Sequence, residues 1–180
     1  MKVITTEIEG LLIIEPTVYG DERGYFYESF RADVLEQAGV TLDFVQDNQS
    51  YSHKGILRGL HFQKDPHAQG KLVRVIKGAV LDVAVDIRKE SKTYGQHYSI
   101  HLDGENKKMF YVPQGFAHGF LTLEDNTLFS YKCTNYYNKE SEGSVKWDSP
   151  ELKIDWGVKS PVLSAKDIEA PLFSDFESPF

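Results

Sequence analysis

Apolar and polar residues alternate with a period of two along much of the chain, a pattern typical of β-strands whose two faces meet different surroundings. The alternation is clearest at residues 79–88, where leucine, valine and isoleucine at positions 81, 83, 85 and 87 are interleaved with Asp82, Ala84 and Asp86. Gly78 separates this run from a second apolar run at residues 71–77. We expect the two runs to form strands joined by a tight hairpin at Gly78.

Short runs rich in β-branched and aromatic residues predict further strands. They cover residues 10–15, 25–30, 43–52, 96–102, 108–112, 119–123 and 127–135. Helical patterning is confined to residues 32–38, before Gly39. The segment after Trp156 contains three prolines and is expected to be loop with at most short helical turns. Many short strands separated by turns indicate an all-β sandwich or barrel.

The length of the chain indicates a single domain. A chain of 180 residues can bury about 70% of its unfolded surface in a core of its own. We therefore expect one barrel domain over residues 1–180, with N-terminal strands and a loop-rich C-terminal tail. The aromatic content of 11 Phe, 10 Tyr and 2 Trp suits packed sheets.

Net charge and cysteine content limit the binding partners and the cellular location that we expect for the protein. The net charge of −7 argues against nucleic acid, which needs a basic surface, but leaves room for one small phosphorylated ligand. The single cysteine, Cys133, excludes an intrachain disulfide and suits a reducing cytoplasm. The apolar run at residues 11–14 is too short for a signal peptide or a membrane span. We expect a cytoplasmic protein with no membrane partner.

Six histidines are the first candidates for chemistry. His53, His97 and His101 lie in turn or polar strand surroundings and are interpreted as structural. The spacings Gly55-x5-His61-x-Gln63 and Pro113-x-Gly115-x-x-His118 resemble the two cupin motifs, but Gln63 stands where a metal-binding cupin has its second histidine. His61, His67 and His118 could still form a three-histidine iron or zinc site. Metal analysis of the purified protein would separate that metal-dependent oxygenase from a metal-free enzyme.

A closer resemblance is carried by eight segments in order. They are DERGYFYESF at 21–30, FVQDN at 44–48, GILRGLHFQ at 55–63, PHAQGKLVR at 66–74, VAVDIR at 83–88, PQGFAHGF at 113–120, YK at 131–132 and SAKD at 164–167. Together they resemble the dTDP-4-dehydrorhamnose 3,5-epimerase family from about residue 2 to about residue 170. Each motif is short, but their shared order makes the resemblance specific.

The resemblance implies a fold and an activity. The expected fold is all-β, a cupin-type double-stranded β-helix (jelly-roll) barrel with a few short helices, which forms a homodimer and uses no metal or other cofactor. The expected enzyme is an isomerase that epimerises C3 and C5 of a dTDP-4-keto-6-deoxy-glucose to dTDP-4-dehydro-L-rhamnose, for dTDP-L-rhamnose biosynthesis. An epimerase that inverts only C3 or C5 in another deoxysugar pathway, and a non-catalytic sugar-nucleotide binding module, remain alternatives.

The resemblance also assigns roles to residues. His61 is the expected base, Asp167 its carboxylate partner, Tyr131 the acid on the opposite face and Lys71 a stabiliser of the enolate. This set suits proton transfer at a carbon next to a ketone, which needs a base, a stabilised enolate oxygen and an acid. Lys71 rather than Lys132 is expected to assist Tyr131, since Lys132 should point to the other face of the strand. The expected substrate-binding residues are Arg23, Phe26, Glu28, Gln46, Asn48, Arg58, Lys71, His118, Glu142 and Lys166.

Each of these residues also has a plainer interpretation. Tyr131 could be an ordinary sheet residue, Asp167 a cap after Ser164, and Lys71 the first residue of an edge strand. Arg23 could be a solvated turn residue and Phe26 part of the core. Residues 58 and 61 face opposite sides of a regular strand, so Arg58 and His61 can share a pocket only if the chain bulges near Gly59.

Overall fold

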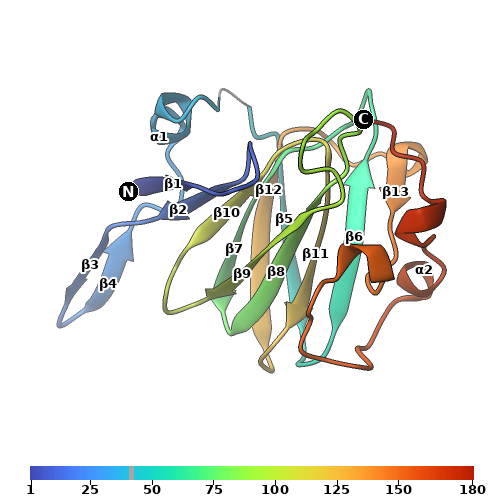
Figure 1. Ribbon diagram of the computed structural model, residues 1–180. Coiled ribbons are helices and arrows are strands. Elements are labelled where there is room, and N and C mark those ends of the chain that lie inside the picture. The colour runs from blue at the N-terminus through green and yellow to red at the C-terminus, as the bar shows by residue number, and fades with distance from the viewer. Residues whose placement is uncertain (41–42) are drawn as a thin grey trace.

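The computed structural model describes residues 1–40 and 43–180, and most of its regular structure is β-strand (Figure 1). In these residues the strands form two large antiparallel sheets and a separate hairpin. The first sheet has the order β1-β2-β10-β7-β12-β5, with β1 Lys2–Thr5, β2 Leu12–Glu15, β10 Met109–Val112, β7 Lys71–Lys77, β12 Thr127–Cys133 and β5 Gln46–Ser52. The second has the order β13-β6-β11-β8-β9, with β13 Glu142–Ser144, β6 Leu57–Gln63, β11 Phe116–Thr122, β8 Ala79–Asp86 and β9 His97–Asp103.

The remaining elements lie outside the two sheets. The strands β3 (Val18–Asp21) and β4 (Gly24–Tyr27) form a hairpin that projects from the body of the molecule (Figure 1). The strand expected at residues 25–30 therefore ends at Tyr27. The helix α1 (Ala32–Gln37) fits the helix expected at residues 32–38. The segment after Trp156 holds only the short helix α2 (Ala165–Ile168) and a single turn, η3 (Phe173–Asp175), as expected. Two further turns lie earlier: η1 (Lys139–Ser141) precedes β13, and η2 (Pro150–Leu152) follows it.

The two sheets face each other across a hydrophobic core, which gives the expected jelly-roll barrel. This core is formed by inward-facing residues of both sheets, among them Val73, Val80, Phe110, Phe120 and Phe129. No helix within residues 1–40 and 43–180 is long and apolar enough to cross a membrane.

The prediction of a hairpin at Gly78 is wrong. The strand β7 pairs with β10 and β12 in the first sheet, whereas β8 pairs with β9 and β11 in the second. Gly78 is therefore the corner at which the chain passes from one sheet to the other. Its φ is +81°, and a Cβ atom there would lie 2.2 Å from Thr127 Oγ1, so only glycine fits this corner.

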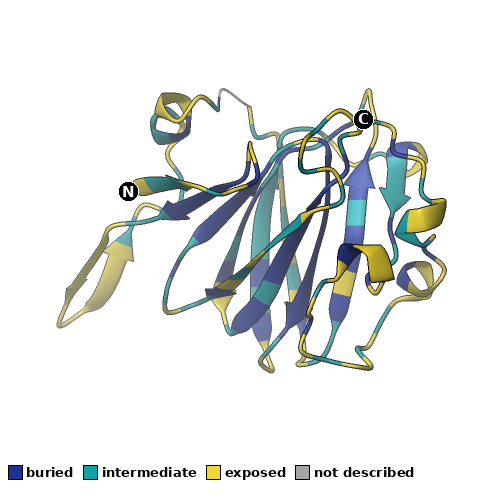
Figure 2. Cartoon of the chain, in the orientation of Figure 1, coloured by how far each residue is buried: buried dark blue, intermediate teal, exposed yellow. Residues whose placement is uncertain are grey.

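The polar face of β8 points into the barrel rather than to solvent. Val80 and Ala84 belong to the core between the sheets, and Asp82 lies between them on the same face with no exposed surface. The apolar face, with Val83 and Val85, is covered by the C-terminal tail (Figure 2). Both faces of β8 are thus buried, and a charged side chain is placed inside the barrel.

Candidate active site

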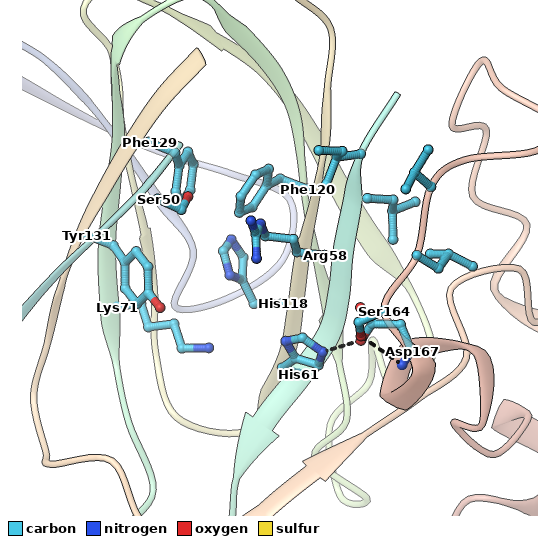
Figure 3. Close-up of a pocket in the computed structure, with 15 residues that line it drawn as sticks. Ser50, Arg58, His61, Lys71, His118, Phe120, Phe129, Tyr131, Ser164 and Asp167 are labelled. Carbon is cyan, nitrogen blue, oxygen red and sulfur yellow. Dashed lines mark hydrogen bonds and ion pairs between the residues drawn. The ribbon is translucent and has the colours of Figure 1, made fainter. Parts of the chain in front are cut away.

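A cavity of about 390 Å³ opens inside the barrel, between the two sheets and the tail (Figure 3). One part of its wall is apolar and includes Phe120, Phe129, Val162 and Leu163. The other part is polar and charged, and consists of Ser50, Arg58, His61, Lys71, His118, Tyr131, Ser164 and Asp167. The four expected catalytic residues therefore lie in one cavity.

His61 in β6 contacts a buried carboxylate from the tail. Its Nε2 lies 2.5 Å from Asp167 Oδ1, and the Asp167 side chain is only 3% exposed. Asp167 Oδ2 accepts a hydrogen bond of 2.8 Å from Ser164 Oγ, and Ser164 also caps α2 by accepting from the Asp167 amide. Burial raises the pKa of Asp167, but the hydrogen bonds from His61 and Ser164 outweigh it and hold the pKa below its usual value. Asp167 is therefore an ionised partner for the imidazole, and the helix cap is Ser164 rather than Asp167.

The strand β6 has a bulge near Gly59. This bulge was predicted as the condition under which Arg58 and His61 could face the same pocket. His118 is opposite His61 and Phe120 is opposite Arg58, so three steps along β6 match two along β11. The extra residue turns both side chains into the cavity. Gly59 has a φ of +135° and packs against Gly119 so closely that a Cβ atom would lie 2.5 Å from Gly119 Cα.

A second imidazole–carboxylate pair reaches the same cavity through its histidine, His118. His118 Nε2 is 2.8 Å from Asp82 Oδ1, and the two side chains are 7% and 0% exposed. The other oxygen of Asp82 has no hydrogen-bond partner among the described residues. Within residues 1–40 and 43–180, His118 is thus the only side chain that forms a hydrogen bond with the Asp82 carboxylate.

Lys71 and Tyr131 reach the cavity from the first sheet, opposite His61 (Figure 3). Burial lowers the pKa of Lys71 and raises the pKa of Tyr131, because it favours the uncharged form of each group. Lys71 is the cation expected to assist Tyr131, but the positive charge that opposes the rise in the Tyr131 pKa is that of Arg58. Lys132 points to the opposite face, as expected, where it pairs with Asp47 at 3.0 Å.

A smaller polar cavity of about 180 Å³ adjoins the first and shares His61, Lys71 and Tyr131 with it. Three expected binding residues, Gln46, Asn48 and Glu142, line this smaller cavity. Lys166 forms an ion pair with Glu142, which places it at the same wall. Six of the expected substrate-binding residues thus surround the two cavities directly, and Lys166 joins them through Glu142.

Arg23, Phe26 and Glu28 are not brought to these cavities within one chain. Arg23 is at the tip of the β3–β4 hairpin, is 85% exposed and pairs with Asp21. Phe26 is 67% exposed on the same hairpin, and Glu28 pairs with Arg31 just beyond it. Figure 2 shows the hairpin as an exposed arm. Phe26 is therefore not a core residue.

The three-histidine site is not assembled. His67 lies outside the cavity lining, with its Nδ1 2.9 Å from Ser141 Oγ. The Gln63 side chain, which replaces a metal-binding histidine, is occupied by the backbone of His67 and Asn138. In residues 1–40 and 43–180 no three His, Cys, Asp or Glu side chains converge to hold a metal ion. The geometry therefore does not support the metal-dependent oxygenase.

Three residues in or next to the site had no place in the sequence prediction. Asp82 was visible only as a polar member of an alternating strand, and Ser164 only as the first residue of the motif at 164–167. Tyr137 lines the smaller cavity with a ring that is 56% exposed, and its hydroxyl donates to Glu142 Oε2 at 3.2 Å. Its position in a short aromatic pair before a charged loop gave no signal that it would reach a cavity.

The fold and the cavity define a class of protein: a jelly-roll barrel whose sheets bring a histidine–aspartate pair, a lysine and a tyrosine to one pocket. A family model described as dTDP-4-dehydrorhamnose 3,5-epimerase matches residues 5–175. The chain belongs to this family.

Known relatives resemble the chain along almost its full length. A dTDP-4-dehydrorhamnose 3,5-epimerase of Shigella flexneri is 52% identical, and the match covers 97% of each protein. A dTDP-6-deoxy-D-glucose-3,5-epimerase of Legionella pneumophila, solved with dTDP-4-keto-L-rhamnose, is 53% identical with a TM-score of 0.93 and coverage of 98% and 94%. A 3'-monoepimerase of Streptomyces bikiniensis, solved with dTDP-quinovose, is 36% identical with a TM-score of 0.89 and coverage of 94% and 86%.

Proposed function

We propose that the protein is an isomerase that epimerises C3 and C5 of a dTDP-4-keto-6-deoxy-glucose, giving dTDP-4-dehydro-L-rhamnose for dTDP-L-rhamnose biosynthesis. The observation that carries the proposal is the placement of His61 and Tyr131 on opposite sheets of one cavity. A sugar between them presents one face to a base and the other to an acid. Inversion at carbon requires this arrangement, because the proton must leave one face and return to the other.

The proton transfers follow from the surroundings of each group. His61 takes the proton from the carbon next to the ketone, and Asp167 stabilises the imidazolium that forms and fixes its orientation. The electron pair moves onto the carbonyl oxygen, where Lys71 can donate a hydrogen bond that stabilises the negative charge. Burial raises the pKa of Tyr131, so the phenol keeps its proton at neutral pH and can return one to the carbon from the opposite face.

The polar part of the site suits a nucleotide diphosphate. Arg58 lines the large cavity, and its guanidinium can bind phosphate or sugar oxygens with two parallel hydrogen bonds. His118, Gln46, Asn48, Glu142 and Lys166 supply further donors and acceptors around the same space. We assign these residues to the binding of the dTDP-sugar.

Arg23, Phe26 and Glu28 can join this site only if a second chain brings them. The hairpin that carries Arg23 and Phe26 projects away from its own barrel and exposes four large hydrophobic side chains, Val18, Tyr19, Tyr25 and Phe26 (Figure 1). Exposed apolar surface of this kind is typical of protein–protein contacts. We propose a homodimer in which each hairpin reaches the cavity of its partner.

The remaining parts of the proposal concern cofactors and location. The transfers described above use only side chains of the chain, so the proposed reaction needs no cofactor. A location in the cytoplasm is supported by Cys133, a free and fully buried thiol.

Solvent deuterium exchange tests the proposal. The protein is incubated with dTDP-4-keto-6-deoxyglucose in D₂O, and the product is examined by NMR. Label at both C3 and C5 is expected. Label at one carbon only would instead favour the activity of the related 3'-monoepimerase, and no label would contradict epimerisation of this substrate. Plain binding without exchange would favour the non-catalytic module.

A further inference from the structure

The strand β4 of the projecting hairpin has two different faces. Tyr25 and Tyr27 are two residues apart and therefore point to the same side, and their rings lie 6.0 Å apart between centroids. Phe26 points to the other side. The face with the two tyrosines contacts the body of the molecule through Lys107 and Arg74, although the Tyr25 ring stays largely exposed, and Phe26 lies on the other face.

Lys107 holds Tyr25 from the loop between β9 and β10. Its Nζ lies 4.1 Å from the centroid of the Tyr25 ring and donates to the carbonyl oxygens of Gly104 at 2.9 Å and Glu105 at 3.3 Å. Although it is a lysine in a surface loop, its side chain is buried, with only 7% of the residue exposed. A desolvated ammonium over an aromatic face is the strong form of the cation–π contact.

The loop that carries Lys107 is fixed by hydrogen bonds between its side chains and its backbone. Asp103 Oδ1 accepts from the amides of Glu105 and Asn106 at 2.8 and 2.5 Å. The Asn106 side chain donates to Asp103 and accepts from the Lys108 amide at 2.9 Å. These bonds fix the turn from which Lys107 reaches the hairpin.

Arg74 holds Tyr27 from the first sheet. It lies in β7 on the face opposite the inward-pointing Val73 and Val75, and its Nη1 donates to the Tyr27 hydroxyl at 2.9 Å. Lys107 and Arg74, from two different parts of the chain, therefore contact alternate residues of β4.

We propose that Lys107 and Arg74 are positioning residues that fix, through Tyr25 and Tyr27, the angle at which the hairpin presents Arg23 and Phe26 to a nucleotide. This inference rests on the proposed function. A two-stranded ribbon is marginally stable alone and would not keep one direction without such anchors. Fixing the arm before the substrate arrives removes an ordering cost from binding.

The proposal predicts an effect on binding rather than on chemistry. Lys107→Met keeps most of the side chain and removes the charge, and should raise KM for the dTDP-sugar about 3- to 10-fold while kcat changes less than about 2-fold. Lys107→Arg keeps a cation over the ring and should restore KM. Lys108→Met is the matched control, because Lys108 is the next residue in the same loop but pairs with Glu15 rather than with the hairpin.

Two further measurements separate aiming of the hairpin from general stability. Tyr27→Phe removes only the hydroxyl that Arg74 binds, and should raise KM in the same way without loss of folded protein. Sedimentation should show the same dimer for all variants. Unchanged KM in Lys107→Met, an equal fall of kcat, or loss of the dimer would overturn the proposal. If the wild-type protein itself shows no exchange, the proposed function falls first, so the two failures are distinguishable.

Discussion

The two imidazole–carboxylate pairs of the cavity differ in how their carboxylates are satisfied. Asp167 accepts from His61 and also from Ser164, so it remains satisfied when His61 exchanges a proton. Asp82 has one oxygen on His118 and the other without a partner among the described residues. A buried carboxylate with a single partner needs that partner continuously. The first pair therefore suits proton transfer, and the second suits a fixed binding group.

Asp167→Asn tests the role of the first pair. Asparagine keeps the size of the side chain but removes the charge that stabilises the imidazolium, so exchange should slow about 10²- to 10⁴-fold, by analogy with triad carboxylates. Solvent deuterium exchange followed by NMR measures the rate. Ser164→Ala is the milder companion, with a loss of about 3- to 10-fold, since it removes one hydrogen bond of about 1 kcal/mol. Equal rates in wild type and Asp167→Asn would contradict the assignment of Asp167.

Tyr131→Phe tests the acid. The substitution removes only the phenolic hydroxyl, so product formation should fall more than the wash-in of solvent deuterium, because His61 can still exchange protons on its own face of the sugar. NMR follows both quantities in one sample. His61→Asn should abolish both. Equal loss of exchange and product in Tyr131→Phe would show that another group is the acid.

The lowered pKa of Asp86 leads to a prediction of how the stability of the protein depends on pH. It is buried at the end of β8, and although burial raises its pKa, hydrogen bonds from Arg88, Ser91 and Thr93 lower it from 3.8 to about 2. A lowered pKa in the folded state stabilises the protein above pH 4, and this contribution is lost as the pH falls from about 4 to 2. Asp86→Asn should therefore cost about 2 kcal/mol at pH 7, and urea unfolding should show the difference shrinking toward pH 3. A difference that stays constant with pH would contradict this account.

At the scale of elements, the sequence pattern predicted strands better than their partners. The period-two alternation of β8 could be predicted from local side-chain geometry alone. The bulge between Arg58 and His61 could be predicted once the resemblance had placed both residues in one pocket, because a regular strand would point them to opposite sides. The corner at Gly78 could not, since a glycine between two apolar strands has the same pattern whether the strands pair or separate into two sheets. The burial of Asp82 was hidden for a similar reason, because an alternating strand does not reveal which face meets solvent.

Gly59→Ala tests the bulge as an element. A methyl group there would meet Gly119 Cα at 2.5 Å and the His118 carbonyl oxygen at 3.0 Å, both of them backbone atoms that cannot move aside alone. We expect a loss of at least about 3 kcal/mol in urea unfolding, together with loss of exchange activity. Gly55→Ala is the matched control, with a φ of +85° and open space around it, and should cost about 1 kcal/mol. Similar costs for both substitutions would mean that the close packing at Gly59 is unimportant.

At the scale of the molecule, the catalytic pair depends on contacts between distant parts of the chain. His61 and Asp167 are 106 residues apart, and the tail brings them together by covering the outer face of the second sheet. Trp147 and Trp156 pack in this cover, and Trp156 Nε1 donates to the Trp147 carbonyl oxygen at 2.9 Å. Spacing along the sequence cannot reveal such a pairing; only the resemblance to a family suggested it.

Whether the hairpin serves its own cavity or the cavity of a partner chain depends on how two whole molecules assemble. Mixed dimers test this question. Chains carrying Arg23→Ala and His61→Asn are produced together with different tags, and the dimer that contains one of each is purified. If each hairpin serves the cavity of the partner, one site in this dimer combines an intact His61 with an intact Arg23. The mixed dimer should then show about half of the wild-type rate, although each parent dimer is strongly impaired.

A second mixture supplies the control. His61 and Asp167 belong to the same cavity of one chain, so a mixed dimer of His61→Asn and Asp167→Asn has a defect in both sites and should stay impaired. If the hairpin instead served its own barrel, the first mixed dimer would be equally impaired, since one site would lack Arg23 and the other His61. Arg23 is exposed on a hairpin that projects from its own barrel (Figure 1) and does not line the cavities of its own chain, which favours recovery of activity in the first mixture alone.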